Sequence, residues 1–229
     1  MDERLTLVAS LYEPCELGAD IGTDHGLLPC HLLETGVCRR MILADISPKA
    51  LRHAEEQVRR RGLEDRATLI CADGLAALRE RAGCISITGI GGKTMAELLR
   101  AGADRLAGAA LVLSAHTDQD QVRRAVRDIG YHFTAERLCQ AAGRFYLVWK
   151  AMPGPRAYTA DELALGTPLL LEGGDPLLPD YLAWRQWVLE RKLAGLIQAA
   201  QPDEAEVARV REALEQLRRH SHADRAERV

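Results

Sequence analysis

The sequence predicts an α/β fold built on a mostly parallel sheet, and three observations lead to this expectation. Apolar strand-like runs alternate with stretches of helical period along residues 1–130. Carboxylates and glycines follow the ends of successive runs, which is where open parallel sheets bind ligands. A chain of 229 residues, 47% of them hydrophobic, can form one such domain and a smaller appendage. Alternation of this kind requires parallel strands joined by right-handed crossovers.

The expected strands and helices follow from the spacing of apolar residues. Strands are expected at 16–20, 40–45, 67–72, 84–88 and 109–115. Helices with an apolar stripe are expected at 4–11, 26–35, 48–61, 75–81, 93–103 and 119–128. Ser47 before Pro48, and also Asp118, are typical helix starts.

Two later runs, 131–140 and 144–152, have strand character and are joined by Ala142-Gly143. They predict a hairpin that adds an antiparallel edge to the sheet. We therefore expect a mostly parallel sheet of seven strands.

The last part of the chain predicts a separate helical module. Pro153 and Pro155 break the chain, so we place the domain boundary between 1–153 and 154–229. Apolar residues then recur at heptad-like spacing and predict an antiparallel helical hairpin from about 179 to 220. Pro202 should end its first helix, and Asp203 with Glu206 resembles a capping box for the second.

Composition limits the classes of protein that this chain can belong to. It has no run of 18 apolar residues and no signal-peptide pattern at its start, so we expect a cytoplasmic protein that does not bind membranes. Its six cysteines form no Cys-x-x-Cys pair and mostly lie in apolar runs, which predicts reduced core residues. Cys30, His31 and Cys38 lack a convincing fourth ligand, so no metal site is expected.

The net charge of −3 gives no bulk attraction to nucleic acid. Any contact with phosphates must therefore use local arginine clusters. The candidates are Arg39-Arg40, Arg59-Arg60-Arg61 and Arg218-Arg219-His220, although such clusters are more often solvated helix ends.

The stretch 17–29, LGADIGTDHGLLP, predicts a strand, a tight turn and a helix. Asp20 ends the strand, Gly22 allows backbone to approach a ligand, and Asp24 and His25 lie in the turn. The alternative is an ordinary turn in which Asp24 only caps the helix.

Three further strand ends favour a nucleotide-like cofactor. Asp45, followed by Ile46, can accept both hydroxyls of an adenosine ribose. Ala72 and Asp73-Gly74 would lie beside the adenine, and the glycines of the fourth strand end, Gly89, Gly91 and Gly92, would leave room for the ligand.

The first turn distinguishes two cofactors. A dinucleotide needs glycine spacing that admits a pyrophosphate, whereas Asp24 puts a negative charge there. A carboxylate suits the cationic sulfonium or amino group of S-adenosylmethionine better. An NAD(P)-dependent oxidoreductase is therefore the weaker enzymatic alternative.

These motifs resemble a known family. ADIGTDHGLLPC is similar to the ADIGSDHAYLP motif of bacterial tRNA (adenine-22 N1)-methyltransferases of the TrmK type, and the similarity continues through ILADIS, CADGL and ITGIGGKTMAELL. The resemblance implies a class I Rossmann-like methyltransferase domain and a helical hairpin that contacts tRNA. The family often has Gln-Pro-Asn after the fifth strand, where this chain has Ser114-Ala115-His116.

Adenine N1 carries a lone pair and no proton, so its methylation needs alignment and charge stabilisation more than a strong base. We assign these roles to Asp24 and His25, although His25 could equally be a turn residue bonded to backbone. Two predictions stay open at this point: a monomer or weak dimer, and, as the non-enzymatic alternative, an RNA-binding module that keeps a nucleotide pocket.

Overall fold

The computed structural model describes residues 1–199, 201 and 203–226, with 220–226 described by backbone alone. The chain divides into two compact units, Met1–Ala157 and Tyr158–Val229. This division falls just after the break that Pro153 and Pro155 predict. Within the described residues, no helix is both long and apolar enough to cross a membrane.

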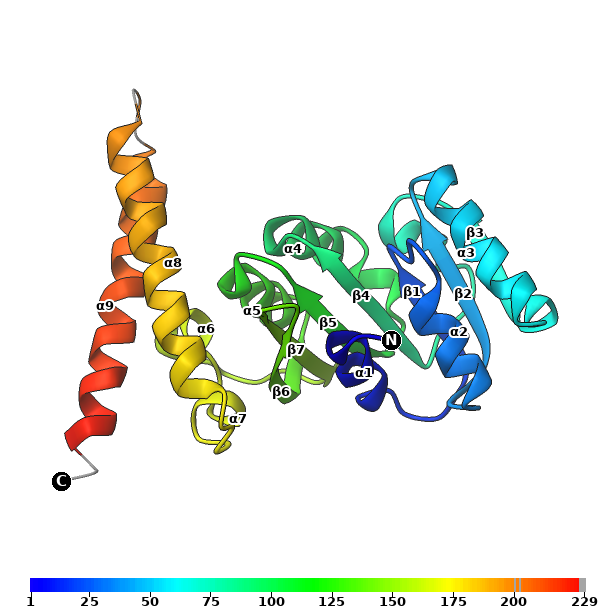
Figure 1. Cartoon of the computed structure of the whole chain (residues 1–229), viewed down its shortest axis with the longest axis horizontal. Coiled ribbons are helices and arrows are strands. Elements are labelled where there is room, and N and C mark those ends of the chain that lie inside the picture. The colour runs from blue at the N-terminus through cyan, green and yellow to red at the C-terminus, as the bar shows by residue number, and fades with distance from the viewer. Residues whose placement is uncertain (200, 202, 227–229) are drawn as a thin grey trace. The chain divides into compact units, whose positions relative to one another are not determined.

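The first unit contains one seven-stranded sheet in the order β3-β2-β1-β4-β5-β7-β6 (Figure 1). The strands are β1 (Cys15–Ile21), β2 (Cys38–Asp45), β3 (Ala67–Cys71), β4 (Cys84–Ile90), β5 (Ala110–Ala115), β6 (Tyr131–Ala141) and β7 (Arg144–Pro153). Strands β1 to β5 pair in parallel, and β7 is antiparallel to both β5 and β6. The prediction of a mostly parallel seven-stranded sheet with an antiparallel hairpin is confirmed.

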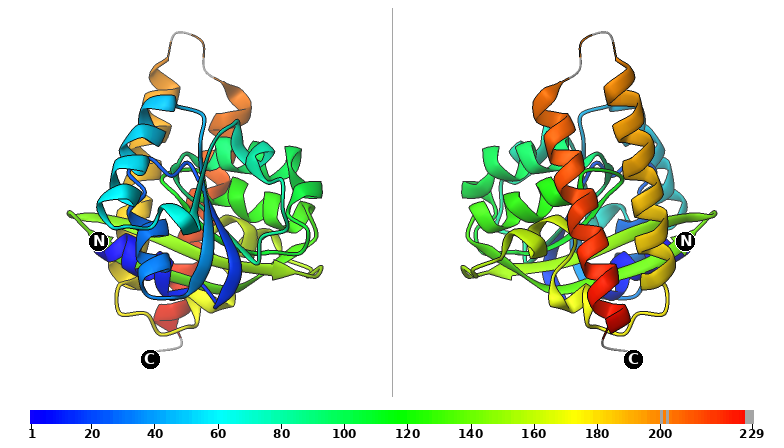
Figure 2. Two further views of the ribbon diagram at one scale, coloured as in Figure 1. Left: turned by 90° about the vertical axis from the view of Figure 1, so that its right-hand side faces the viewer. Right: turned by 90° about the vertical axis from the view of Figure 1, so that its left-hand side faces the viewer.

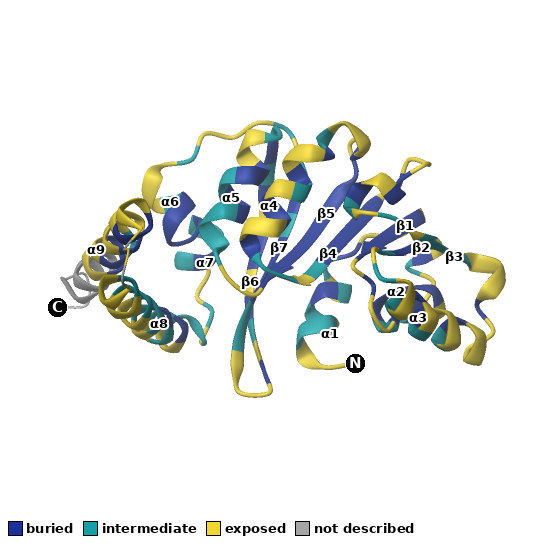
Figure 3. Cartoon of the chain, turned by 90° about the horizontal axis from the view of Figure 1, so that it is seen from above, coloured by how far each residue is buried: buried dark blue, intermediate teal, exposed yellow. Residues whose placement is uncertain are grey.

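Helices cover both faces of this sheet (Figure 3). One face carries α1 (Glu3–Ser10), α2 (Leu27–Glu34) and α3 (Pro48–Arg60), and the other carries α4 (Gly92–Ala101) and α5 (Gln119–Asp128). The chain thus changes face where it passes from the β1–β3 half to the β4–β5 half. The carboxyl ends of β1 and β4, which are neighbours in the sheet, frame the crevice in which such folds bind ligands.

The burial of the sheet explains why its strands appear in the sequence as continuous apolar runs. The central strands are buried on both faces, so β5 has no exposed residue and β1 is buried from Leu17 to Ile21. Aliphatic side chains of α1 and α2, such as Val8 and Leu32, pack with Met41 in one continuous cluster. Continuous apolar runs are typical of such doubly covered parallel strands.

One local prediction is wrong. The helix expected at 75–81 is only a 3₁₀ turn, η2 (Gly74–Ala77), because the chain becomes extended at Leu78 and so buries both Leu75 and Leu78. Asp118 lies at the start of α5, as expected, but with a φ of 50° it makes no side-chain capping bond, and its carboxylate accepts the Thr117 hydroxyl instead. Ser47, by contrast, caps the backbone N–H of Ala50 as expected.

The cysteines are all free, but only some are core residues. Cys30, Cys38 and Cys84 are buried, as predicted, whereas Cys71 is exposed at the end of the edge strand β3. Edge position, which the apolar sequence around Cys71 does not reveal, explains the difference.

The second unit consists of α6 (Ala160–Ala164), α7 (Pro168–Leu171), α8 (Leu178–Gln198) and α9 (Glu204–Ala226). Helices α8 and α9 lie side by side as an antiparallel pair, which confirms the predicted hairpin (Figures 1 and 2). Asp203 accepts the Glu206 N–H at 3.0 Å, as the predicted capping box requires. Pro202, the expected end of the first helix, lies outside the described residues.

The seam of this hairpin is uneven. On α9 the predicted apolar positions are buried: Val207, Val210, Leu214 and Leu217. On α8 the leucines at the heptad-like positions are only half-buried: Leu182, Leu189, Leu193 and Leu196. The buried residues of α8 are instead Tyr181 and Arg185. Trp187 is 52% exposed and lies under the Arg191 guanidinium at 5.0 Å.

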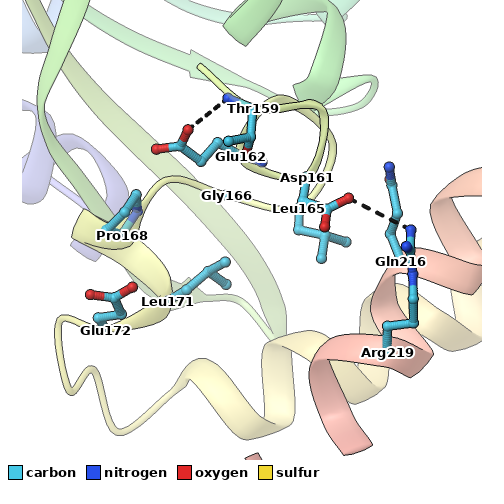
Figure 4. A pocket seen from close by; sticks show the side chains of 10 residues that line it. All are labelled: Thr159, Asp161, Glu162, Leu165, Gly166, Pro168, Leu171, Glu172, Gln216 and Arg219. Carbon is cyan, nitrogen blue, oxygen red and sulfur yellow. Dashed lines mark hydrogen bonds and ion pairs between the residues drawn. The ribbon is translucent and has the colours of Figure 1, made fainter. Parts of the chain in front are cut away.

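A cavity of about 330 Å³ lies within the second unit (Figure 4). Thr159 and Glu162 form a complete capping box at its edge, and Asp161 pairs with Arg219 at 3.7 Å. Glu172 adds a third carboxylate to the lining. An acidic lining of this kind does not favour phosphate.

Candidate active site

The crevice between the ends of β1 and β4 begins at two glycines. Gly22 follows β1 with a φ of 80°, and Gly89, near the end of β4, has a φ of 81°. A Cβ on Gly22 would meet nothing nearer than the Thr88 carbonyl at 3.9 Å. Glycine is therefore required there for backbone conformation, and the space in front of the loop stays open.

The turn after β1 is fastened to the neighbouring strand. Gly22 and Thr23 both donate their N–H to the Ala44 carbonyl, at 2.8 and 3.0 Å. Gly26 begins α2 with a φ of 66°, and a Cβ there would come within 3.1 Å of Ala54 on α3. Contacts with β2 and α3 thus restrain the backbone of this turn.

Asp24 and His25 project from this turn into solvent. Their side chains are 66% and 59% exposed, and Asp24 Oδ2 lies 3.4 Å from His25 Nε2. Asp24 does not cap α2, because Gly26 occupies the cap position without a side-chain hydrogen bond. The alternative of a purely capping Asp24 is therefore wrong, and both groups are available to a ligand.

His53 of α3, which the sequence did not single out, stacks on His25 with ring centroids 5.2 Å apart and planes inclined by 11°. Asp24, His25 and His53 could offer three metal-ligand atoms within 4.8 Å of one another. Nearly parallel rings cannot both aim an in-plane lone pair at one ion, so a metal would require the rings to turn.

Asp45 lies beside the turn at the end of β2. Its Oδ1 accepts the Ser47 N–H at 2.7 Å, while Oδ2 lies 3.5 Å from the Asp24 nitrogen, at the limit of a hydrogen bond. The carboxylate is half-buried, and Oδ2 keeps lone-pair capacity toward the crevice. This is the arrangement that recognition of a pair of hydroxyls requires.

The residues that follow β2 and β3 lie together. The Ala72 N–H donates to the Asp45 carbonyl at 3.2 Å, which places the ends of β2 and β3 side by side. Ile46 is 67% exposed, an unusual state for a large aliphatic side chain. Asp73 is also exposed, whereas a Cβ on Gly74 would come within 2.9 Å of Leu98, so Gly74 is explained by packing against α4.

The glycines after β4 differ from one another. Gly89 and Gly91 have no neighbour closer than 3.5 Å to a Cβ position, which leaves their outer faces free. A Cβ on Gly92 would lie 2.3 Å from the Thr117 and Asp118 carbonyl oxygens. Gly92 therefore allows α4 to pack against the loop after β5, a structural requirement independent of any ligand.

Asp20 is the buried carboxylate of the predicted set, 4% exposed. Ser86 of β4 donates its hydroxyl to Asp20 Oδ1 at 2.5 Å, and Tyr12 donates to the Ser86 oxygen at 2.7 Å. Burial raises the pKa of Asp20, against the lowering effects of Ser86 and of the positive charge of Arg4. Asp20 thus lies beneath the turn, where it contributes charge rather than direct contact.

Three residues complete this edge that sequence reasoning did not place in the site. His116 follows β5 and lies against Gly89, and Tyr146 of β7 meets the His116 ring edge-on at 5.9 Å. Arg4 of α1 lies over the Tyr146 ring, 5.5 Å from its centroid. Burial, and then the charge of Arg4, lower the pKa of His116. The rule that ligand-binding residues follow the carboxyl ends of parallel strands, here called the strand-end rule, could have identified His116. No signal in the sequence identified Arg4 or Tyr146.

In a comparison with known proteins, residues 1–149 match the family model described as a methyltransferase domain. A tRNA (adenine(22)-N(1))-methyltransferase of Bacillus subtilis is 29% identical over 173 residues, 75% of this chain and 73% of the relative.

A solved structure from Streptococcus pneumoniae, assigned as a tRNA (m1A22) methyltransferase, superposes with a TM-score of 0.83 at 26% identity over 96% of this chain and 99% of that one. The same protein in complex with S-adenosyl-L-methionine gives a TM-score of 0.82 at 26% identity, over 95% and 98% of the two chains.

Proposed function

The chain belongs to the methyltransferase-domain family, and from this premise we propose that it transfers a methyl group from S-adenosylmethionine to N1 of an adenine, at position 22, in tRNA. One observation carries the proposal: the open glycine loop after β1 lies beside the available carboxylate of Asp45 at the point where the strand order reverses. The names of the B. subtilis and S. pneumoniae relatives supply the substrate.

The residues of this crevice fit S-adenosylmethionine. Asp45 Oδ2 would accept a hydrogen bond from a ribose hydroxyl, and the exposed Ile46 would cover one face of the adenine. Ala72 and Asp73 would lie along the adenine edge, where a carboxylate can accept from an amino group. Gly22, Gly89 and Gly91 leave the space that the cofactor would fill.

The turn supports methyl transfer over hydride transfer. Asp24 places an exposed carboxylate where an NAD(P) pyrophosphate would have to lie, which is electrostatically unfavourable. The oxidoreductase alternative is therefore not favoured by the charge of the site.

S-adenosylmethionine supplies a methyl group bonded to a positively charged sulfur. The chain's own contribution is alignment and electrostatics. The fixed turn holds Asp24 at the mouth of the crevice, where its negative charge stabilises the positive charge that develops on the methylated base. His25, paired with Asp24, orients that carboxylate. Adenine N1 has no proton to remove, so no strong base is needed at the moment of transfer.

The second unit would contact tRNA, and the reaction would take place in the cytoplasm. The exposed Trp187 with Arg191 above it offers a surface for base stacking. Arg218 and Arg219 are exposed, but each pairs with a carboxylate at 3.7 Å, so they would add positive charge only by exchanging these partners for phosphate. The monomer or weak dimer stays a prediction.

The decisive experiment measures transfer of a radiolabelled methyl group to tRNA transcripts with A or G at position 22. We expect labelling of the A22 transcript alone, and loss of labelling with Asp45→Ala. Calorimetry on Asp45→Ala should show donor affinity lower by about 1–3 kcal/mol, the scale of a charge-assisted hydrogen bond. Cofactor binding without labelling would indicate the RNA-binding alternative instead.

A chain that ends at Ala157 tests the role of the second unit, because the first unit has its own sheet and core. Donor binding should survive while tRNA methylation falls steeply, and tRNA affinity of the full chain should weaken with added salt. Near-normal tRNA turnover by this shortened chain would assign the second unit to stability or self-association.

A further inference from the structure

Arg4 is a half-buried cation with an incomplete set of partners. Its guanidinium lies over the Tyr146 ring, and its Nη1 is enclosed yet makes no hydrogen bond to the residues that the structure describes. An enclosed donor without a partner costs free energy, and native structures satisfy more than nine in ten such groups, so each exception calls for an explanation.

The position of Arg4 points to the crevice. Tyr146 contacts His116, and His116 lies against Gly89 at the end of β4. The charge of Arg4 also acts on the buried Asp20 at the end of β1. Arg4 is therefore near both strand ends that frame the proposed cofactor site.

Asp20 does not neutralise this cation directly. Its Oδ1 is engaged by Ser86, and no hydrogen bond or ion pair joins it to Arg4 among the described residues. The guanidinium thus keeps donor capacity in a partly desolvated place, where a bond to an anion is stronger than at the open surface.

The charges of the cofactor match this arrangement. S-adenosylmethionine carries two positive groups, the sulfonium and the ammonium, and one negative group, the carboxylate. The carboxylates Asp20, Asp24 and Asp45 suit the positive groups and would repel the negative one. A carboxylate accepts the parallel N–H donors of a guanidinium well.

We propose that Arg4 binds the carboxylate of the methionine part of S-adenosylmethionine, with Tyr146 holding the guanidinium in place from its other face. This inference rests on the proposed function, since it names a subsite of the same cofactor. A tRNA phosphate has related chemistry, and the experiment below separates the two sources.

The test compares two ligands by calorimetry: S-adenosylhomocysteine, which has the carboxylate, and 5′-methylthioadenosine, which lacks the whole amino-acid part. Arg4→Met keeps the length of the apolar stem and removes the charge. It should weaken S-adenosylhomocysteine binding about tenfold or more, equivalent to about 1.4 kcal/mol per factor of ten, and leave 5′-methylthioadenosine binding unchanged. Arg4→Lys, which keeps the charge without the fork, should fall between.

Arg105→Met is the matched control, because Arg105 is exposed in the short turn η3 (Ala103–Arg105), which leads into the amino end of β5. It should change neither affinity. Equal loss of both ligands in Arg4→Met, or no loss of either in a folded Arg4→Met and Arg4→Lys, would overturn the inference. Unchanged S-adenosylhomocysteine affinity with a raised KM for tRNA would assign Arg4 to a phosphate and also overturn it. If the wild-type chain binds neither ligand, it is the proposed function that fails.

Discussion

Two arginines of the first unit lie over aromatic rings of the same strand, β7, yet they differ in how their charge is neutralised. The Arg123 guanidinium carbon is 5.7 Å from the Trp149 ring centroid, and that of Arg4 is 5.5 Å from the Tyr146 centroid. Each has a buried carboxylate nearby: Glu136 for Arg123 and Asp20 for Arg4.

The Arg123 cluster is closed. Glu136 Oε1 accepts from Arg123 Nε and Nη2, at 2.9 and 2.6 Å, and from Trp149 Nε1 at 2.9 Å. The Arg4 cluster is open, since Nη1 has no partner among the described residues. In the first unit, the buried cation that supports the sheet edge is thus fully bonded, whereas the half-buried cation beside the proposed cofactor site is not.

Opening the closed cluster should have the largest effect. Arg123→Met leaves Glu136 buried without its cation and should lower the free energy of unfolding by about 3–5 kcal/mol. Urea unfolding measures this loss. Arg127→Met, which removes only the exposed pair with Asp128, is the control and should cost no more than about 1 kcal/mol. Equal losses in the two variants would mean that the buried bonding contributes nothing special.

Removing a charge from the open side should change function while stability is kept. Asp24→Asn preserves shape, and because Asp24 is exposed we expect unfolding free energy to change by less than about 0.5 kcal/mol. We expect kcat to fall about tenfold or more, with donor affinity changed much less, since the charge acts on the developing cation. A proportional loss of donor affinity and kcat would make a transition-state role unnecessary.

The buried Asp20 should respond to pH in the opposite sense from a paired surface acid. Its pKa is raised in the folded state, so the folded chain binds the proton more tightly, and stability falls as pH rises above the ordinary aspartate range. Asp20→Asn should therefore raise the thermal midpoint at pH 7. The corresponding gain in the free energy of unfolding should be about 1 kcal/mol or less. The advantage should shrink as the solution is acidified. An advantage independent of pH would assign it to packing.

The smallest expected effect is a change at His116. Burial and the charge of Arg4 lower the pKa of His116 in the folded chain. Arg4→Met should raise that pKa toward its ordinary value, which NMR titration of the His116 ring would detect. Arg105→Met, the exposed control, should leave the pKa of His116 unchanged.

Much of the fold could be predicted from the sequence, because doubly covered strands give continuous apolar runs. The helix expected at 119–128 matches α5 as observed, and the break at Ala142-Gly143 lies in the β6–β7 turn. The expected helix at 75–81 was wrong because a short apolar stretch does not reveal that its residues must enter the core from an extended chain. Local spacing carries no information about that packing.

The site was predictable where it follows strand ends and unpredictable where it depends on packing between distant elements. Asp24, Asp45 and Asp73 were found by the strand-end rule, and the structure brings Asp24 and Asp45 together. Arg4 precedes the first strand, and Tyr146 reaches the site only through the antiparallel register of β7. The reasons for Gly74 and Gly92 also appear only in three dimensions, since Leu98 and the loop after β5 are what a Cβ would strike.

The shared acceptor at Ala44 has a kinetic consequence. One carbonyl of β2 accepts the N–H of both Gly22 and Thr23, so the protein's own hydrogen bonds hold the glycine turn without a contribution from a ligand. A preformed loop loses little conformational entropy on association. The amides of Gly22 and Thr23 should therefore exchange slowly with deuterium in the free protein, and nucleoside binding should follow a single association phase without a slow rearrangement of this turn.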